Sequence, residues 1–113
     1  FIDAMEDYPE LEFHREDSVL HNYQLLVARV TNGKRDLFMS KMAEAGVQCV
    51  VQYYPLYRYD LYKKAGYGEA DCPNTDQFFD NMVSFPFNHL LTDDQITDII
   101  TAARETLDHL RHA

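Results

Sequence analysis

Residues 92–110 carry a stripe of apolar side chains that the rest of the chain must cover. The stripe recurs at helical spacing and comprises Ile96, Ile99, Ile100, Ala103, Leu107 and Leu110. Thr92 and Gln95 form a capping-box pattern, and Asp93 and Asp94 complement the positive end of a helix. This regularity predicts a long helix packed on a core, so it indicates structure and not chemistry.

Three shorter segments have the composition or spacing of β-strands. Residues 23–30, "YQLLVARV", are rich in branched and aromatic side chains and stop at a Thr-Asn-Gly turn. Residues 47–53 alternate between the two faces of a strand, and Pro55 ends the run because proline has no amide hydrogen for a neighbouring strand. Residues 83–85 form a brief third strand before another proline.

Two further segments predict helices. Residues 34–46, "KRDLFMSKMAEAG", place four apolar side chains on one side at helical spacing, and Gly46 supplies the left-handed residue that often ends a helix. The four are Leu37, Phe38, Met42 and Ala45, whereas Met39 lies off this stripe. A shorter helix is capped by Asn74 or Thr75. Its apolar side comprises Phe78, Phe79, Met82 and Val83.

The order strand, helix, strand, long loop, helix, strand, helix predicts a two-layer α+β fold. We expect about three strands, with about three helices packed on one face of the sheet. The folded domain spans residues 21–113. Residues 1–20 form an acidic lead-in or linker, because residues 1–17 hold seven acids and a Tyr-Pro pair and show no sustained apolar period.

The charge and cysteine content exclude several classes of protein. Ten Lys and Arg against nineteen Asp and Glu give a formal net charge of -9, which repels nucleic-acid phosphates and anionic membranes. No apolar run is long enough to span a bilayer, and no signal segment opens the chain. Cys49 and Cys72 are isolated and cannot form the disulfide framework of a small secreted domain. We therefore expect a cytoplasmic protein with reduced thiols and with no nucleic-acid or membrane partner.

The sequence contains no recognisable catalytic or metal-binding motif. The five histidines form neither an H-x-x-x-H nor an H-E-x-x-H pattern, and no phosphate-binding glycine loop or G-x-S-x-G turn occurs. The four glycines have the positions of turn and cap residues, although Gly66 and Gly68 could also let the backbone approach a ligand. We expect no catalytic residue and no metal ligand in this chain.

The segment 53–76, "YYPLYRYDLYKKAGYGEADCPNTD", holds six of the eight tyrosines in one long irregular connection. A tyrosine joins an apolar ring to a polar tip, so such a cluster suits a wall that packs on one side and hydrogen-bonds on the other. Arg58 has a planar fork for a carboxylate or phosphate, flanked by tyrosines that stack or donate hydroxyls. The same composition is typical of protein interfaces. Both interpretations remain open, with interface or packing favoured.

Five short motifs in a fixed order resemble the C-terminal small domain of the DegT/DnrJ/StrS family, the sugar aminotransferases that use pyridoxal phosphate. The family pattern runs through R-D-x-L, A-x-G-[IV], Y-x-P-L, C-P-N-[AT] and a proline segment that opens the last helix. In this sequence the matching stretches are Arg35-Asp36-Leu37, Ala45-Gly46-Val47, Tyr53 to Leu56, Cys72 to Thr75, and Ser84 to Gln95. The resemblance covers about residues 20–110.

The resemblance implies an enzyme of the aspartate-aminotransferase fold type that moves an amino group, usually from glutamate, to a keto-sugar attached to a nucleotide. In such enzymes the small domain packs on a large cofactor-binding domain and supplies part of the substrate cleft. The tyrosine-rich segment resembles the part near the sugar nucleotide and the domain boundary. On this basis the candidate substrate or interdomain contacts are Tyr53, Tyr54, Tyr57, Arg58 and Lys63, with Lys64 a lesser one.

The family holds its cofactor as a Schiff base on a lysine of the large domain, beside a glycine-rich stretch. The four lysines here are Lys34, Lys41, Lys63 and Lys64, and none has that context. Pyridoxal chemistry needs the lysine and an acidic partner around the ring, so we expect this chain alone to bind no cofactor and to be inactive.

Three functional hypotheses follow. The leading one is a small aminotransferase domain that docks on the large pyridoxal-phosphate domain, or forms a homo-oligomer, through an exposed apolar face. The second is a free-standing ligand-binding or protein-interaction module that reuses the fold, since fold does not determine function. An independent small enzyme draws support only from Arg58 and its neighbouring tyrosines.

Overall fold

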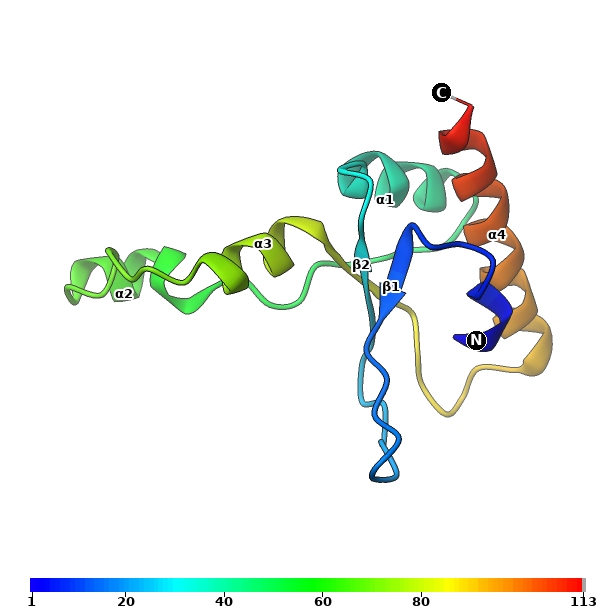
Figure 1. Ribbon diagram of the computed structural model, residues 1–113, viewed down its shortest axis with the longest axis horizontal. Helices are drawn as coiled ribbons and strands as arrows, with labels where there is room; N and C mark the ends of the chain where they lie inside the picture. Colours follow the sequence, from blue (N-terminus) through cyan, green and yellow to red (C-terminus); the bar gives the residue numbers. More distant parts are fainter. Residues whose placement is uncertain (113) are drawn as a thin grey trace.

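The computed structural model describes residues 1–112, which form a three-stranded antiparallel sheet, helices packed on it, and a projecting arm (Figure 1). In chain order the elements are η1 (Asp3–Met5), β1 (Leu11–Phe13), β2 (Leu26–Val30), α1 (Arg35–Glu44), η2 (Leu56–Arg58), α2 (Asp60–Lys64), α3 (Pro73–Asn81), β3 (Met82–Phe85) and α4 (Asp93–Arg111). The predicted α+β class is confirmed. No helix of the described part is long and apolar enough to cross a membrane.

The sheet has the order β1-β2-β3, with Leu11 opposite Val30 and Leu26 opposite Phe85. Two predicted strands are therefore confirmed, as β2 and β3. The strand predicted at residues 47–53 is wrong, because that segment makes only one isolated bridge, between Val50 and Ser84, before it turns into the arm. Its alternation reflects burial of Val47 and Cys49 beside the sheet and not membership of it.

The core lies between one face of this sheet and the helices α1 and α4, which contact each other (Figure 1). Along β2, Leu26, Ala28 and Val30 point into this core, as the alternation of a half-covered strand requires. From α1 only Phe38 and Met42 are fully buried. The predicted stripe of α1 is therefore correct for Phe38 and Met42 but wrong for Leu37 and Ala45, which are exposed. Met39, which was predicted to lie off the stripe, packs against the core.

Helix α4 has the predicted start and the predicted buried face. The Gln95 amide donates to Thr92 Oγ1 at 3.1 Å, and the Thr92 amide donates to Gln95 Oε1 at 2.9 Å, so the capping box is confirmed. The buried members of the predicted stripe are Ile99, Ala103, Leu107 and Leu110, while Ile96 and Ile100 are half-buried.

The amino-terminal segment contains two elements that the sequence interpretation missed. Residues 1–17 were expected to lack regular structure, but β1 forms an edge of the sheet, and Met5 and Leu11 are buried in the core. Arg111 forms a bidentate ion pair with Glu10 and holds the pKa of that carboxyl below its usual value. The guanidinium also lies 4.7 Å from the centre of the Tyr8 ring. Short alternating runs with many acids conceal such an edge strand, because only every second side chain needs to be apolar.

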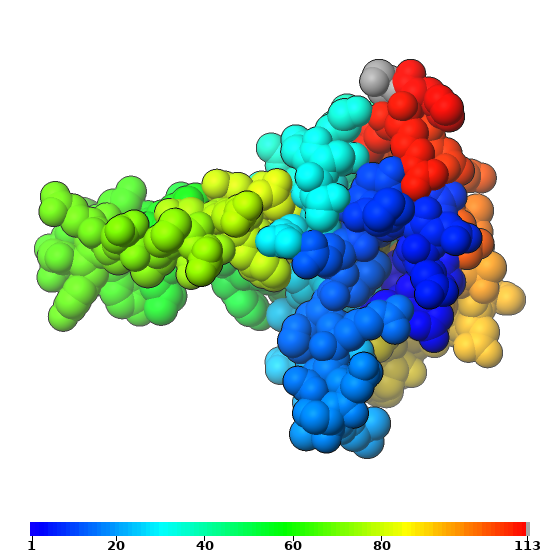
Figure 2. All heavy atoms as spheres, in the orientation of Figure 1, coloured from blue at the N-terminus to red at the C-terminus, as the bar shows by residue number. Residues whose placement is uncertain are grey.

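Residues 54–81 form the arm, which contains η2, α2 and α3 and projects from the remaining residues, the body (Figure 2). The radius of gyration is 15.7 Å, compared with about 13 Å for a compact domain of this size. Helix α3 was expected over the sheet, but it lies in the arm (Figure 1). Its predicted cap is also wrong. The helix starts at Pro73 after an uncapped Cys72, because proline at the first position needs no amide partner.

The two cysteines are free, as expected. Cys49 belongs to the core, and burial raises the pKa of its thiol to about 12. Cys72 is half-buried at the start of α3.

The role of the amino-terminal segment is testable with two leucines of residues 1–20. Leu11 is 5% exposed and Leu20 is 99% exposed. Leu11→Ala should lower the free energy of unfolding by about 2 kcal/mol, because it leaves a cavity beneath β1. The matched Leu20→Ala should change it by less than about 0.5 kcal/mol. Urea denaturation followed by circular dichroism measures both, and equal midpoints for the two variants would show that β1 does not stabilise the fold.

Candidate functional site

The arm is held together by one acidic side chain that faces two predicted contact residues. Asp76, on α3, accepts hydrogen bonds from the Tyr57 hydroxyl and from Arg58 Nη2, the latter at 2.6 Å. Arg58 Nη1 also lies 3.4 Å from Asp80 Oδ1, one helical turn further along α3. These contacts join η2 to α3 and close the arm into a hairpin.

Arg58 is consequently committed to internal partners. Its side chain is 27% exposed, and its guanidinium faces the two carboxylates of Asp76 and Asp80. The three groups together carry a formal charge of -1, so a phosphate or carboxylate ligand would compete against two built-in anions. The geometry therefore favours a packing role for Arg58 over the binding of a ligand carboxylate or phosphate, which the shape of its guanidinium group had suggested.

Phe79 is the aromatic centre of the arm and was not singled out from the sequence as a site residue. Its ring meets Tyr54 edge to face, with centroids 5.1 Å apart, and Tyr54 packs similarly on Tyr59. The guanidinium carbons of Arg58 and Arg35 lie 5.3 and 5.9 Å from the Phe79 ring centre. Both distances are within the range of a cation–π contact.

The outer end of the arm exposes a groove of about 590 Å³ with a mostly apolar lining. It is lined by Leu56, Tyr57, Tyr62, Gly66, Tyr67, Glu69 and Ala70. Leu56 is 64% exposed and Tyr67 is 66% exposed. Large apolar side chains that are exposed side by side in this way are uncommon on the surface of a monomeric protein. Of the five predicted contact residues, only Tyr57 lines this groove.

The remaining predicted contacts lie at the root of the arm, on its outside or within its packing. Tyr53 is 70% exposed at the arm root, and Lys63 is exposed on α2 without an ion pair among residues 1–112. Gly68 lies so close to Lys63 that a Cβ on Gly68 would approach Lys63 Cγ to 2.9 Å. Gly68 therefore allows a close approach of the chain within the arm. Gly66 is needed for another reason, because its φ of +93° is in the left-handed region that favours glycine.

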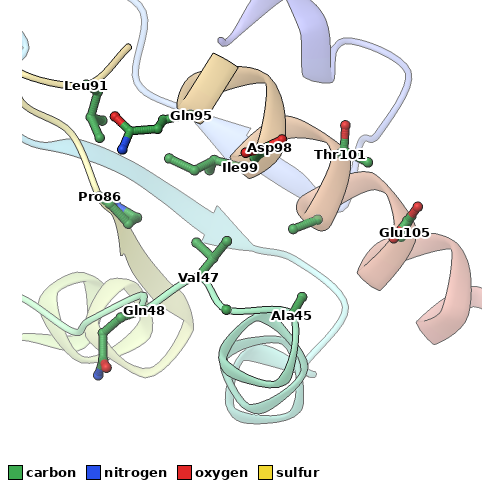
Figure 3. Close-up of a pocket in the computed structure, with 12 residues that line it drawn as sticks. Ala45, Val47, Gln48, Pro86, Leu91, Gln95, Asp98, Ile99, Thr101 and Glu105 are labelled. Atoms are coloured by element: carbon green, nitrogen blue, oxygen red, sulfur yellow. The ribbon is translucent and has the colours of Figure 1, made fainter. Parts of the chain in front are cut away.

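A second groove, of about 530 Å³, lies on the body between α4 and the turn that follows α1 (Figure 3). Val47 and Ile99 contribute to its floor, and Gln48, Asp98 and Glu105 lie along its sides. It contains none of the predicted contacts. Because its only charged side chains are acidic, it offers no cation for a phosphate.

No group of three or more His, Cys, Asp or Glu that could hold a metal ion occurs within residues 1–112. None of the four lysines has the surroundings of a cofactor anchor. Lys34 Nζ donates to the Leu110 carbonyl at 2.9 Å, and Lys41 pairs with Glu44 at 2.8 Å on α1. Lys63 and Lys64 lie exposed at the end of the arm. None is enclosed by the ring-sized, acid-containing pocket that a Schiff-base lysine needs.

Comparison with known proteins places the fold and the family. The model of the DegT/DnrJ/EryC1/StrS aminotransferase family matches residues 1–104. The spore coat polysaccharide biosynthesis protein SpsC of Bacillus subtilis is 30% identical over 95 residues. This alignment covers 79% of the chain and 24% of SpsC. The chain therefore belongs to the DegT/DnrJ/EryC1/StrS aminotransferase family.

Solved structures of sugar aminotransferases share the fold. PseC of Helicobacter pylori, an aminotransferase of pseudoaminic acid biosynthesis, superposes with a TM-score of 0.81 at 18% identity. That match covers 95% of this chain and 30% of PseC. The putative sugar aminotransferase Spr1654 of Streptococcus pneumoniae, in its PMP form, gives 0.81 at 23% identity, over 96% of this chain and 29% of its own. The chain thus spans about a quarter to a third of the relatives it matches.

The internal bonding of the arm can be tested at Asp76. Asp76→Ala removes the acceptor that Tyr57 and Arg58 share, which should destabilise the closed arm by roughly 1.5 kcal/mol. Chymotrypsin should then cleave after the arm tyrosines about tenfold faster, because cleavage follows the population of the open form. Asp71→Ala is the control, since Asp71 is exposed on the same arm and its side chain makes no hydrogen bond within residues 1–112. Equal cleavage rates in the two variants would contradict the assigned role of Asp76.

Proposed function

We propose that this chain is the small domain of a pyridoxal-phosphate-dependent nucleotide-sugar aminotransferase of polysaccharide biosynthesis. It contributes one wall of the substrate cleft and a surface for the large domain, and it has no catalytic competence alone. The observation that carries the proposal is the arm, a projecting element with large exposed apolar and tyrosine side chains, in a chain that belongs to an aminotransferase family. A cytoplasmic location accompanies this proposal.

The residues present do not fit the cofactor. A pyridoxal ring needs an amine for the Schiff base and an acid near its nitrogen. Lys34 and Lys41 are engaged on the body surface, and Lys63 and Lys64 have no enclosing pocket. In this proposal the cofactor and its lysine belong to the remaining two thirds that the relatives possess, so no chemical step is assigned to this chain.

The arm has the chemistry of a nucleotide-sugar wall. Tyrosine rings stack on a base and their hydroxyls hydrogen-bond sugar hydroxyls, which suits Tyr53 and Tyr57. The ammonium group of Lys63, which has no ion pair within residues 1–112, can approach a diphosphate. Arg58 supports the wall from inside by holding η2 on α3, and Tyr54 does so through Phe79. The apolar groove at the arm end provides the interdomain or intersubunit surface.

The alternative of a free-standing module predicts a different surface. A module adapted to stand alone should cover its former interface with charge, and the net charge of -9 agrees with such adaptation. The exposed Leu56, Leu61 and Tyr67 of the arm disagree with it. We therefore favour the docked domain.

The absence of a lysine in a cofactor pocket can be tested directly. The purified 113-residue chain incubated with pyridoxal phosphate should develop no stable internal-aldimine absorbance, because no lysine is enclosed with an acidic partner. It should also transfer no amino group from glutamate. A stable absorbance band that one Lys→Ala substitution abolishes would overturn this expectation.

The contribution of the arm to substrate binding can be tested in the protein at its natural length. Lys63→Ala should raise KM for the nucleotide sugar by about tenfold and leave KM for the amino donor unchanged, because an ion contact to a phosphate is lost. Lys41→Ala is the matched control, since Lys41 pairs with Glu44 on the body. Equal KM values for the two variants would remove Lys63 from the cleft.

A further inference from the structure

The arm joins the body at two places, the segment after Cys49 and the junction where α3 passes into β3. Within residues 1–112, the only side-chain hydrogen bond that crosses from body to arm is the one that Arg35 donates to the Phe79 carbonyl. This residue is the first of α1, so it belongs to the packed layer whose Phe38 and Met42 are in the core. A side chain anchored in the core thus reaches the root of the arm.

Arg35 serves as the end cap of α3. Its Nη1 donates to the Phe79 carbonyl and to the Met82 carbonyl, both at 2.9 Å. Phe79 lies in the last turn of α3, where carbonyl groups lack partners within the helix and the helix dipole favours a cation. Met82 is the first residue of β3, so one guanidinium nitrogen bridges the two sides of the junction.

The guanidinium is itself held in place. Arg35 Nε donates to Asp36 Oδ1 at 2.6 Å, and the Arg35 side chain is only 12% exposed. Its central carbon lies 5.9 Å from the centre of the Phe79 ring, which is also contacted by Arg58 and Tyr54. The contacts therefore run continuously from α1, through Arg35 and Phe79, to the tyrosines and Arg58 of the arm.

We propose that Arg35 is a positioning residue that sets the direction in which the arm leaves the body. This inference rests on the proposed function in one respect only, namely that the arm is a wall of the nucleotide-sugar cleft. Without Arg35 the two carbonyls lose a charged donor and Phe79 loses one of its cations. The arm then swings more widely about its root, while the core around Phe38 and Met42 is unchanged. A lysine restores the charge but cannot reproduce the planar fork.

The geometric part is tested by electron spin resonance distance measurement in the natural-length protein. Nitroxide labels are attached at Lys64→Cys on the arm and Thr101→Cys on α4, both exposed sites, in a Cys72→Ser background. Cys49 stays unlabelled because it is buried. Arg35→Ala should broaden the distance distribution about twofold, because the junction loses both hydrogen bonds. Arg35→Lys should give an intermediate width.

Lys34→Ala is the matched control. Lys34 precedes Arg35 but bonds the end of α4 at Leu110, within the body, so the variant should keep the original distance distribution. Thermal unfolding checks that each variant is folded. If Arg35→Ala fails to fold, Arg35→Lys decides alone. A folded Arg35 variant with an unbroadened distribution, or equal broadening in Lys34→Ala, would overturn the inference.

The functional part is read from steady-state kinetics of the same variants. Arg35→Ala should raise KM for the nucleotide sugar about tenfold while kcat changes less than about threefold, because a misdirected wall weakens binding more than chemistry. Partial recovery in Arg35→Lys supports positioning. Broadening of the distribution with an unchanged KM would keep Arg35 as the positioning residue and would reject the arm as a cleft wall.

Discussion

Burial of the apolar stripe of α4 is the constraint on which the rest of the structure depends. Ile99, Ala103 and Leu107 need an opposing layer, and the sheet together with α1 provides it. The capping box at Thr92 determines where α4 begins. At the other end of the helix, an ion pair between Arg111 and Glu10 joins α4 to the amino-terminal segment. The body is therefore a two-layer unit with its own core.

The position of the arm is determined by other interactions. It has few body contacts and exposes Leu56, Leu61 and Tyr67, so hydrophobic burial cannot account for its position. Internal hydrogen bonds around Asp76 keep it closed, and the Arg35 guanidinium joins it to the body. Charged and hydrogen-bonded groups thus hold these apolar side chains away from the core of the domain, which agrees with the proposed docking role. In the proposed function, that surface lies in the part of the relatives that this chain does not match.

The parts of the fold governed by a local period could be predicted from the sequence. The stripe of α4 and the runs of β2 and β3 report their burial directly. The strand predicted at 47–53 failed because alternation records which side chains are buried and not which backbone pairs, and Val50 bonds Ser84 at one position only. Strand β1 was missed because only Leu11 and Phe13 face the core among acidic neighbours.

The tyrosine-rich segment could be recognised in the sequence, but its internal contacts could not. The tyrosine-rich composition located the arm, and the order of the motifs identified the family. The partner of Arg58 could not be predicted from the sequence. Asp76 lies 18 positions further along the chain, and no helical or strand periodicity relates the two residues. The spacing of Asp76 and Asp80 along one helical face was a usable signal that two carboxylates face one direction. The R-D-x-L motif singled out Arg35 but not its contacts at the arm root, since its partners there are backbone carbonyls.

The most direct test of the central claim is hydrogen exchange of the natural-length protein with and without a nucleotide sugar. If the arm is a wall of the cleft, amides between Leu56 and Gly68 should become protected when the ligand binds, while those of α4 keep their exchange rates. Unchanged exchange in the arm, with the ligand bound elsewhere, would contradict the account.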